Sequence, residues 1–175
     1  MRYAIEGADS RVGGEEGMSK LWTGRLLRIP PPLLFVATFF AGVGLQRLFP
    51  LPRLSASSSE AVQIASFGLL ACGLLLALSS VGLFWAVRTT IIPFGTASNL
   101  ITRGPYRFTR NPMYLSLVLV YIGVAGMLTL AWPLLLLPLP VVIINTIVIP
   151  FEEARLQDVF GAEFAQYCSN VRRWL

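Results

Sequence analysis

An arginine and a pair of glutamates stand at the two ends of the longest uncharged stretch of the chain. That stretch runs from Met113 to Phe151; Arg110 lies just before it, and Glu152-Glu153 follow it directly. It is about twice as long as one membrane helix needs, so it predicts two antiparallel helices whose outer ends meet. An arginine can hold an anionic group, and carboxylates can hold a cation or accept a proton.

Two interpretations of these charges follow from the residues. Charged groups at a membrane boundary are costly unless they are solvated or used, which favours a functional site. Alternatively, Arg110 is a topology charge and the glutamates stabilise a helix N-terminus through its dipole. The residues alone leave both interpretations open.

The residue types that are missing narrow the chemistry. The chain has no histidine, which excludes histidine-based acid–base catalysis and most zinc sites, and we expect no metal. Its two cysteines, Cys72 and Cys168, are too few for a disulfide framework and are expected to be small packing residues. Glu152 and Glu153 are then the only plausible local bases.

The composition is that of a membrane protein. Of 175 residues, 55% are hydrophobic and 13% are charged, whereas soluble domains carry about a quarter charged residues. The mean hydropathy is +0.67, and the apolar residues occur in long blocks. The sequence therefore predicts an all-α integral membrane protein with about four transmembrane helices, near residues 29–48, 61–87, 113–130 and 133–150. A bend at Trp132-Pro133 separates the last two.

The distribution of basic residues predicts the orientation. Twelve of the 14 lysines and arginines lie on one side of these spans, which favours a cytoplasmic location for that side and for both termini. The net charge of +5 is explained by this bias and by attraction to anionic lipid, and no nucleic acid is expected as a partner. The twelve are Arg2, Arg11, Lys20, Arg25, Arg28, Arg88, Arg103, Arg107, Arg110, Arg155, Arg172 and Arg173; Arg47 and Arg53 lie on the other side.

Polar segments flank the predicted membrane domain. We expect residues 1–24 to be a disordered cytoplasmic lead and residues 25–175 to form one domain. After Pro150, apolar residues recur at helical spacing, which predicts an amphipathic cytoplasmic helix at the C-terminus. The residues on its apolar face are Leu156, Phe160, Phe164 and Tyr167.

Two segments together resemble the isoprenylcysteine carboxyl methyltransferase family and its bacterial relatives. The first runs from Gly104 to Tyr114 (GPYRFTRNPMY). The second begins at Glu152-Glu153, continues through residues 160–167 (FGAEFAQY) and ends at Val171-Arg172-Arg173-Trp174. The resemblance covers roughly residues 88–175, and phospholipid N-methyltransferases look like more distant members of the same fold. The family motif usually has a histidine where this chain has Asn111.

The resemblance implies S-adenosyl-L-methionine as the cofactor and a pocket formed by residues 88–114 and 150–175. Arg110 would hold the cofactor's carboxylate and Glu152 or Glu153 its ammonium, with Arg110 and Glu153 as the catalytic pair. Tyr106 and Tyr114 would offer aromatic faces. The remaining cofactor-binding residues that it implies are Gly104, Pro105, Asn111 and Pro112. The chain lacks the glycine-rich fingerprint of soluble dinucleotide-binding folds.

The methyl acceptor stays open at this point. A prenylated cysteine carboxylate, a phospholipid amine, a small thiol and a quinone-like molecule all remain candidates, and each would reach the site from the bilayer. The bacterial resemblance implies a bacterial inner membrane and makes a prenylated protein the less favoured acceptor. Two other functions also remain: a membrane reductase that uses NADPH, and a non-catalytic membrane scaffold. Nothing in the sequence indicates the oligomeric state.

Overall fold

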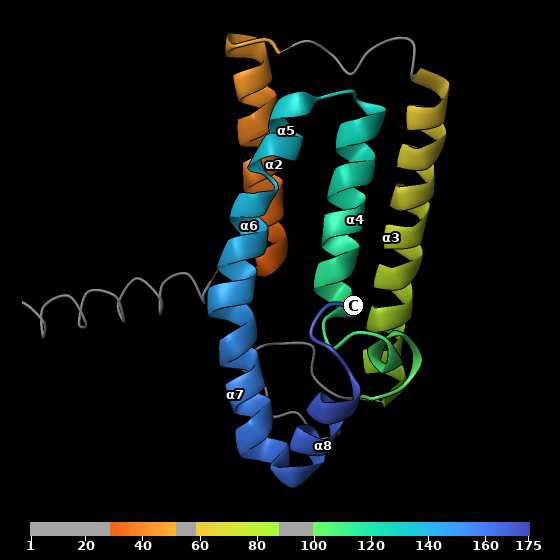
Figure 1. The fold of residues 1–175 in the computed structure, drawn as a ribbon, viewed down its shortest axis with the longest axis vertical. Helices are drawn as coiled ribbons and strands as arrows, with labels where there is room; N and C mark the ends of the chain where they lie inside the picture. The colour runs from red at the N-terminus through yellow and green to blue at the C-terminus, as the bar shows by residue number, and fades with distance from the viewer. Residues whose placement is uncertain (1–28, 52–58, 88–99) are drawn as a thin grey trace, which may run out of the picture.

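The computed structural model describes residues 29–51, 59–87 and 100–175, and every regular element in those ranges is helical. The predicted lead and residues 88–99 of the predicted cofactor region lie outside the described residues. Figure 1 shows antiparallel helices side by side, with the C-terminal elements gathered at one end of the bundle. The predicted all-α membrane fold is confirmed.

The first two predicted spans are single helices. α2 covers Pro31–Leu48 and begins with prolines in its first turn, where a missing backbone donor is tolerated. α3 covers Ser59–Val87. Both carry exposed large apolar side chains, such as Phe40 on α2 and Leu75 on α3, and both are long and apolar enough to cross a membrane.

The third predicted span is shorter than expected. α4 covers Pro112–Met127, and a turn at Thr129, whose φ is +51°, reverses the chain. α4 packs along α3, where glycines let the two backbones approach closely. A Cβ added at Gly123 would lie 2.7 Å from the backbone nitrogen of Leu70, and one added at Gly73 would lie 2.9 Å from that of Val120.

The fourth span is a rod of four consecutive helical segments: α5 (Ala131–Leu136), α6 (Pro138–Ile143), the π-turn η3 (Ile144–Val148) and α7 (Ile149–Phe160). The helix does not end where the predicted span ends, near residue 150, because α7 continues to Phe160. The whole stretch Ala131–Phe160 is long and apolar enough to cross a membrane.

The predicted single amphipathic tail helix is also interrupted. The chain turns at Gly161, whose φ of +49° is a conformation that favours glycine, and α8 then covers Ala162–Asn170. Phe164 and Tyr167 on α8 are buried, as their apolar spacing suggests. The last residues then run back toward the start of α4 (Figure 1).

The core lies where α2, α4 and the fourth rod meet. Phe35, Tyr121, Ile144, Val148 and Ile149 form a buried cluster. The Tyr121 hydroxyl donates a hydrogen bond to the Pro133 carbonyl (3.0 Å), which fixes α4 against the start of the rod. This packing holds the two ends of the α4–α7 hairpin in register.

Candidate functional site

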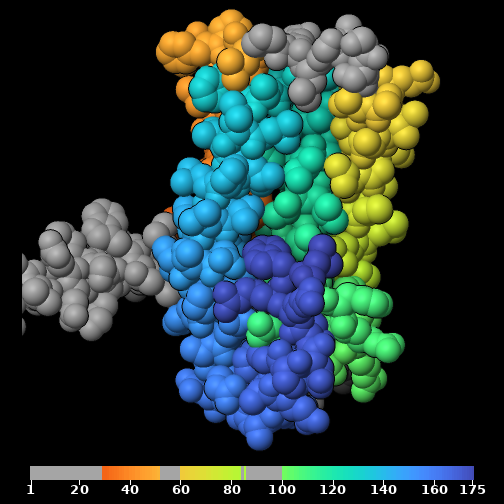
Figure 2. All heavy atoms as spheres, viewed as in Figure 1, coloured from red at the N-terminus to blue at the C-terminus, as the bar shows by residue number. Residues whose placement is uncertain are grey.

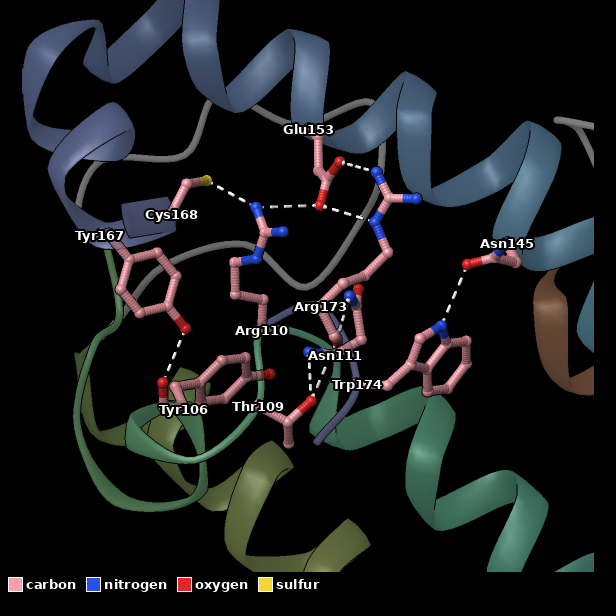
Figure 3. A network of polar contacts seen from close by, with 10 residues as sticks. All are labelled: Tyr106, Thr109, Arg110, Asn111, Asn145, Glu153, Tyr167, Cys168, Arg173 and Trp174. Carbon is pink, nitrogen blue, oxygen red and sulfur yellow. Dashed lines mark hydrogen bonds and ion pairs between the residues drawn. The ribbon is translucent and has the colours of Figure 1, made fainter. Parts of the chain in front are cut away.

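The site is built on a tight turn that precedes α4. The 3-10 helix η2 (Gly104–Arg107) begins at Gly104, whose φ is +57°, and a Cβ there would also meet Leu83 at 2.8 Å. Tyr106 in this turn is buried, and its carbonyl accepts a hydrogen bond from the Tyr167 hydroxyl on α8 (2.7 Å). The turn and α8 are thus joined directly, as Figure 3 shows.

Burial keeps both of these phenols protonated. Desolvation raises the pKa of Tyr167 to about 12, although the nearby Arg110 charge opposes the shift. Desolvation, with smaller contributions from Tyr167 and Glu152, also raises the pKa of Tyr106. The raised pKa means that Tyr167 remains a hydrogen-bond donor, and continues to hold the turn, at alkaline pH where an exposed tyrosine would ionise.

Arg110 lies between the turn and the helical rod. Its backbone N–H donates to the Arg172 carbonyl (3.0 Å). Its Nη1 lies 3.2 Å from Glu153 Oε1 and donates to Cys168 Sγ at 2.6 Å. Its Nε is buried and has no hydrogen-bond partner, alone among the buried side-chain nitrogens and oxygens of the described residues. An orphaned donor on a charged group marks a place where an acceptor is missing.

Glu153, on α7, accepts from two arginines at once. Arg173 approaches it with Nη2 at 2.6 Å from Oε2 and Nε at 3.2 Å from Oε1, a bidentate pair, while Arg110 approaches from the other side. The Glu153 side chain is 20% exposed. Two guanidinium groups and one carboxylate leave this cluster with one unit of positive charge, which favours an anionic ligand.

Glu152 has a different environment from its neighbour. Successive helical residues point about 100° apart, so Glu152 faces another direction. Its Oε1 accepts a hydrogen bond from the Tyr114 hydroxyl at 2.6 Å. Among the described residues no arginine or lysine forms an ion pair with Glu152. Of the two adjacent glutamates, Glu152 is the one whose charge is not already balanced by a guanidinium group.

The polar side chains next to Arg110 bind the tail. Asn111 Nδ2 donates to the Arg173 carbonyl (2.9 Å), and the Thr109 hydroxyl donates to the same carbonyl (3.1 Å). Thr109 Oγ1 also accepts from the Asn111 N–H (3.1 Å). Pro112 is fully buried at the first turn of α4. Asn111 therefore holds the tail in this structure.

The structure thus brings Arg110 and Glu153 into contact, and it places Glu152, Asn111 and Tyr114 around them. It also contributes residues that the sequence argument missed as site members: Thr109, Cys168, Tyr167 and Arg173. Cys168 was expected only to pack, but its sulfur contacts Arg110. The sequence predicts no role for Arg173 beyond that of a topology charge. Its place in the C-terminal motif is the feature of the sequence that could have identified it as a site residue.

An open hollow of about 420 Å³ lies between residues 100–107 and α8. Neither Arg110 nor the two glutamates line it, and Tyr167 is the residue that it shares with the site. The other residues that line it are Leu100, Thr102, Arg107, Glu163, Gln166, Asn170 and Val171. Figure 2 shows the C-terminal segment covering this end of the molecule. The hollow and the Arg110–Glu153 cluster are separate features.

Within the described ranges, no group of three or more histidine, cysteine, aspartate or glutamate side chains could hold a metal ion. The polar groups of the site are guanidinium, carboxylate, phenol, hydroxyl, thiol and amide groups. Such a set can hold a ligand that carries both an anionic and a cationic group.

Comparison with known proteins gives one match. The profile of the phospholipid methyltransferase family matches residues 62–163, which include most of α3, the turn, α4, the rod and both glutamates. Searches of curated proteins and of solved structures found no match. The match covers the first resembling segment and the glutamate pair, and it stops short of residues 171–174. Because it spans more than half of the chain, the protein belongs to the phospholipid methyltransferase family, within the isoprenylcysteine carboxyl methyltransferase-like group of membrane methyltransferases.

Proposed function

We propose that this protein is a membrane-embedded methyltransferase that uses S-adenosyl-L-methionine to methylate a lipophilic acceptor. Its family supports methyl transfer, and its apolar helices support a location in the bilayer. The observation that carries the proposal is the contact between Arg110, whose buried Nε has no partner, and Glu153, next to Glu152 at the end of the α4–α7 hairpin.

The residues present fit the amino-acid end of this cofactor. The positively charged Arg110–Glu153–Arg173 cluster suits a carboxylate, and Arg110 Nε is a donor that still lacks an acceptor. Glu152, whose described partner is the neutral Tyr114 hydroxyl, suits the ammonium group. We therefore assign the ammonium to Glu152 and assign Glu153 the task of orienting Arg110. Turning Asn111 from the tail carbonyl would free its amide for the ligand.

The cofactor, when bound, supplies an activated methyl group and a good leaving group, so the protein's tasks are alignment and exclusion of water. Arg110 and Glu152 would fix the cofactor at its charged end. The rings of Tyr106 and Tyr114 would lie against its sulfonium or its adenine. The apolar helices around the site would keep water away from the acceptor.

A phospholipid amine is the acceptor that we favour, because the family is described by phospholipid methylation. A neutral amine becomes nucleophilic through its lone pair, and its nitrogen loses a proton once it is methylated. Glu153 is held by two arginines and Glu152 is assigned to the cofactor's ammonium, so neither carboxylate is free to act as a general base, and the proton would leave to water. An ionised carboxylate or thiolate acceptor would release no such proton.

Titration of the purified protein in detergent tests the proposal against its two rivals. We expect S-adenosylhomocysteine to bind and NADPH not to bind. Binding of NADPH alone would identify a reductase, and binding of neither would identify a scaffold. Transfer of a labelled methyl group from S-adenosylmethionine would then be measured with phosphatidylethanolamine, a prenylcysteine, a small thiol and a quinol as separate acceptors. Labelling of any acceptor other than the phospholipid would overturn the amine assignment and leave the methyltransferase assignment intact.

A further inference from the structure

The last residues of the chain form a strap across the candidate site. We use this name for residues 171–174, which follow α8 and run beside the start of α4 (Figure 3). The Arg172 carbonyl accepts from the Arg110 N–H, and the Arg173 carbonyl accepts from both Thr109 and Asn111. Three consecutive residues of the site are thus bonded to the strap backbone.

The end of the strap is fixed to the fourth rod. The Trp174 indole N–H donates to Asn145 Oδ1 at 3.0 Å, and Asn145 lies in the π-turn η3. The Trp174 ring also packs on the core cluster of α2, α4 and the rod. The strap is therefore held at its backbone by the turn before α4 and at its tip by the rod.

Between these two attachments, the Arg173 side chain binds Glu153. Two of its nitrogens contact the two carboxylate oxygens, which fixes the plane of that carboxylate more firmly than one contact could. Arg110 contacts Oε1, so the direction of its guanidinium group depends on a carboxylate that Arg173 holds. Arg110 Nε, the orphaned donor, is part of the same planar group.

We infer that Arg173 is a positioning residue: it orients Glu153, and through Glu153 it orients Arg110 toward the carboxylate of the bound cofactor. This inference rests on the proposed function, because it names how the proposed cofactor site is kept in shape. It also assigns a function to the strap, which lies beyond the part of the chain that matches the family.

The adjacent Arg172 provides a matched control. Arg172 is exposed, and its carbonyl contributes the strap contact to Arg110. Arg172→Gln and Arg173→Gln remove the same charge from neighbouring positions of the same segment. Only the second removes the contacts to Glu153, so a general effect of charge on the tail would affect both variants equally.

The test is calorimetric titration of S-adenosylhomocysteine into each variant in detergent, with thermal unfolding measured in parallel. We expect Arg173→Gln to raise the dissociation constant about five- to tenfold and Arg172→Gln to leave it within about twofold, as expected for losing a charge-assisted contact that acts indirectly. In a Glu153→Gln background, Arg173→Gln should have no further effect. If Arg173 served only to hold the strap in place, Arg173→Gln would still raise the dissociation constant in that background.

Arg173→Lys keeps the charge but cannot form the planar two-nitrogen contact, so its affinity should fall between those of wild type and Arg173→Gln. It also replaces Arg173→Gln if that variant does not fold. Equal affinity of wild type, Arg173→Lys and Arg173→Gln would overturn the inference and leave the proposed function standing. Failure of the wild-type protein to bind S-adenosylhomocysteine would instead overturn the proposed function, and the inference with it.

Discussion

Arg110 is the side chain on which the proposed cofactor site depends most. Arg110→Ala should weaken the binding of S-adenosylhomocysteine by about 1.5–3 kcal/mol, or one to two decades in dissociation constant, because a charge-assisted contact is lost. Calorimetric titration in detergent measures the change. Arg172→Ala, at an exposed position, is the control and should bind like wild type. Near-wild-type affinity of Arg110→Ala would favour a role as a topology charge alone.

The two adjacent glutamates should respond differently to the same substitution. Glu153→Gln leaves Arg110 and Arg173 facing each other without a carboxylate, so we expect a loss of about 1–2 kcal/mol in unfolding free energy, moderated by partial exposure to solvent. In Glu152→Gln the amide oxygen can still accept from Tyr114, so stability should change little.

The effects on activity should be the reverse of those on stability, with the larger loss in Glu152→Gln. Glu152→Gln should reduce methyl transfer at limiting cofactor by about one to two decades, as expected for the loss of the charge-assisted contact to the cofactor's ammonium. Thermal unfolding and labelled methyl transfer, measured on both variants, give the comparison. Equal effects of the two substitutions on stability and on transfer would show that the glutamates share one task.

Some of this site could be predicted from the sequence and some could not. The contact between Arg110 and Glu153 follows from hairpin length, because two apolar legs of similar length return the chain to the same boundary. The pair between Arg173 and Glu153 does not, because it depends on the reversal at Gly161 and on the path of the strap. Neither the reversal at Gly161 nor the path of the strap produces a periodic pattern in the sequence. The family-like motif at residues 171–174 indicated importance but not a partner.

Close packing of α3 on α4 makes a prediction about glycine. Gly123→Ala should destabilise the protein by about 1–3 kcal/mol, because its Cβ would meet the Leu70 backbone, which cannot move without separating the helices. Gly68→Ala, on α3, is the matched control, since nothing lies within 4 Å of the added carbon. Thermal unfolding in detergent reports the difference. Two equally stable variants would mean that the helices adjust freely at this contact.

The helices themselves were largely predictable, and their irregularities were not. Apolar blocks without charge fix the existence of α2 and α3, and Pro112 fixes the start of α4. The fourth rod departs from the expected helix because Leu137-Pro138 and the π-turn interrupt it without ending it. A membrane helix is apolar on all of its faces, so the spacing of its apolar residues does not reveal such local changes in winding.

The ends of the bundle carry unequal charge, which supports one orientation of the molecule in the membrane. Among the described residues, Arg47 lies at the end where α2 finishes, and six arginines lie at or beyond the opposite end. The six are Arg103, Arg107, Arg110, Arg155, Arg172 and Arg173. We propose that this second end, with the candidate site, is cytoplasmic.

Cysteine labelling in intact cells tests this orientation. In a background of Cys72→Ser and Cys168→Ser, an impermeant maleimide should label Glu60→Cys, at the start of α3, and not Glu163→Cys, on α8. Both positions are exposed, so access across the membrane decides the result. Lysed cells provide the control, in which both should react. The reverse pattern would place the site on the outer face.

The π-turn η3 adds a residue to the rod relative to a regular helix. The side chains that follow it therefore point in other directions than they would in a regular helix. Each residue rotates an α-helix by about 100°, so an added residue turns everything after it by that angle. Asn145 lies in the turn, and Glu152 and Glu153 follow it. Deleting the exposed Thr146 would restore regular winding and rotate both glutamates away from Arg110 and Tyr114, although every residue of the site would still be present. The site thus depends on the spacing of residues that never touch it, and a one-residue shift within an apolar span is a route by which this fold can lose or acquire an activity.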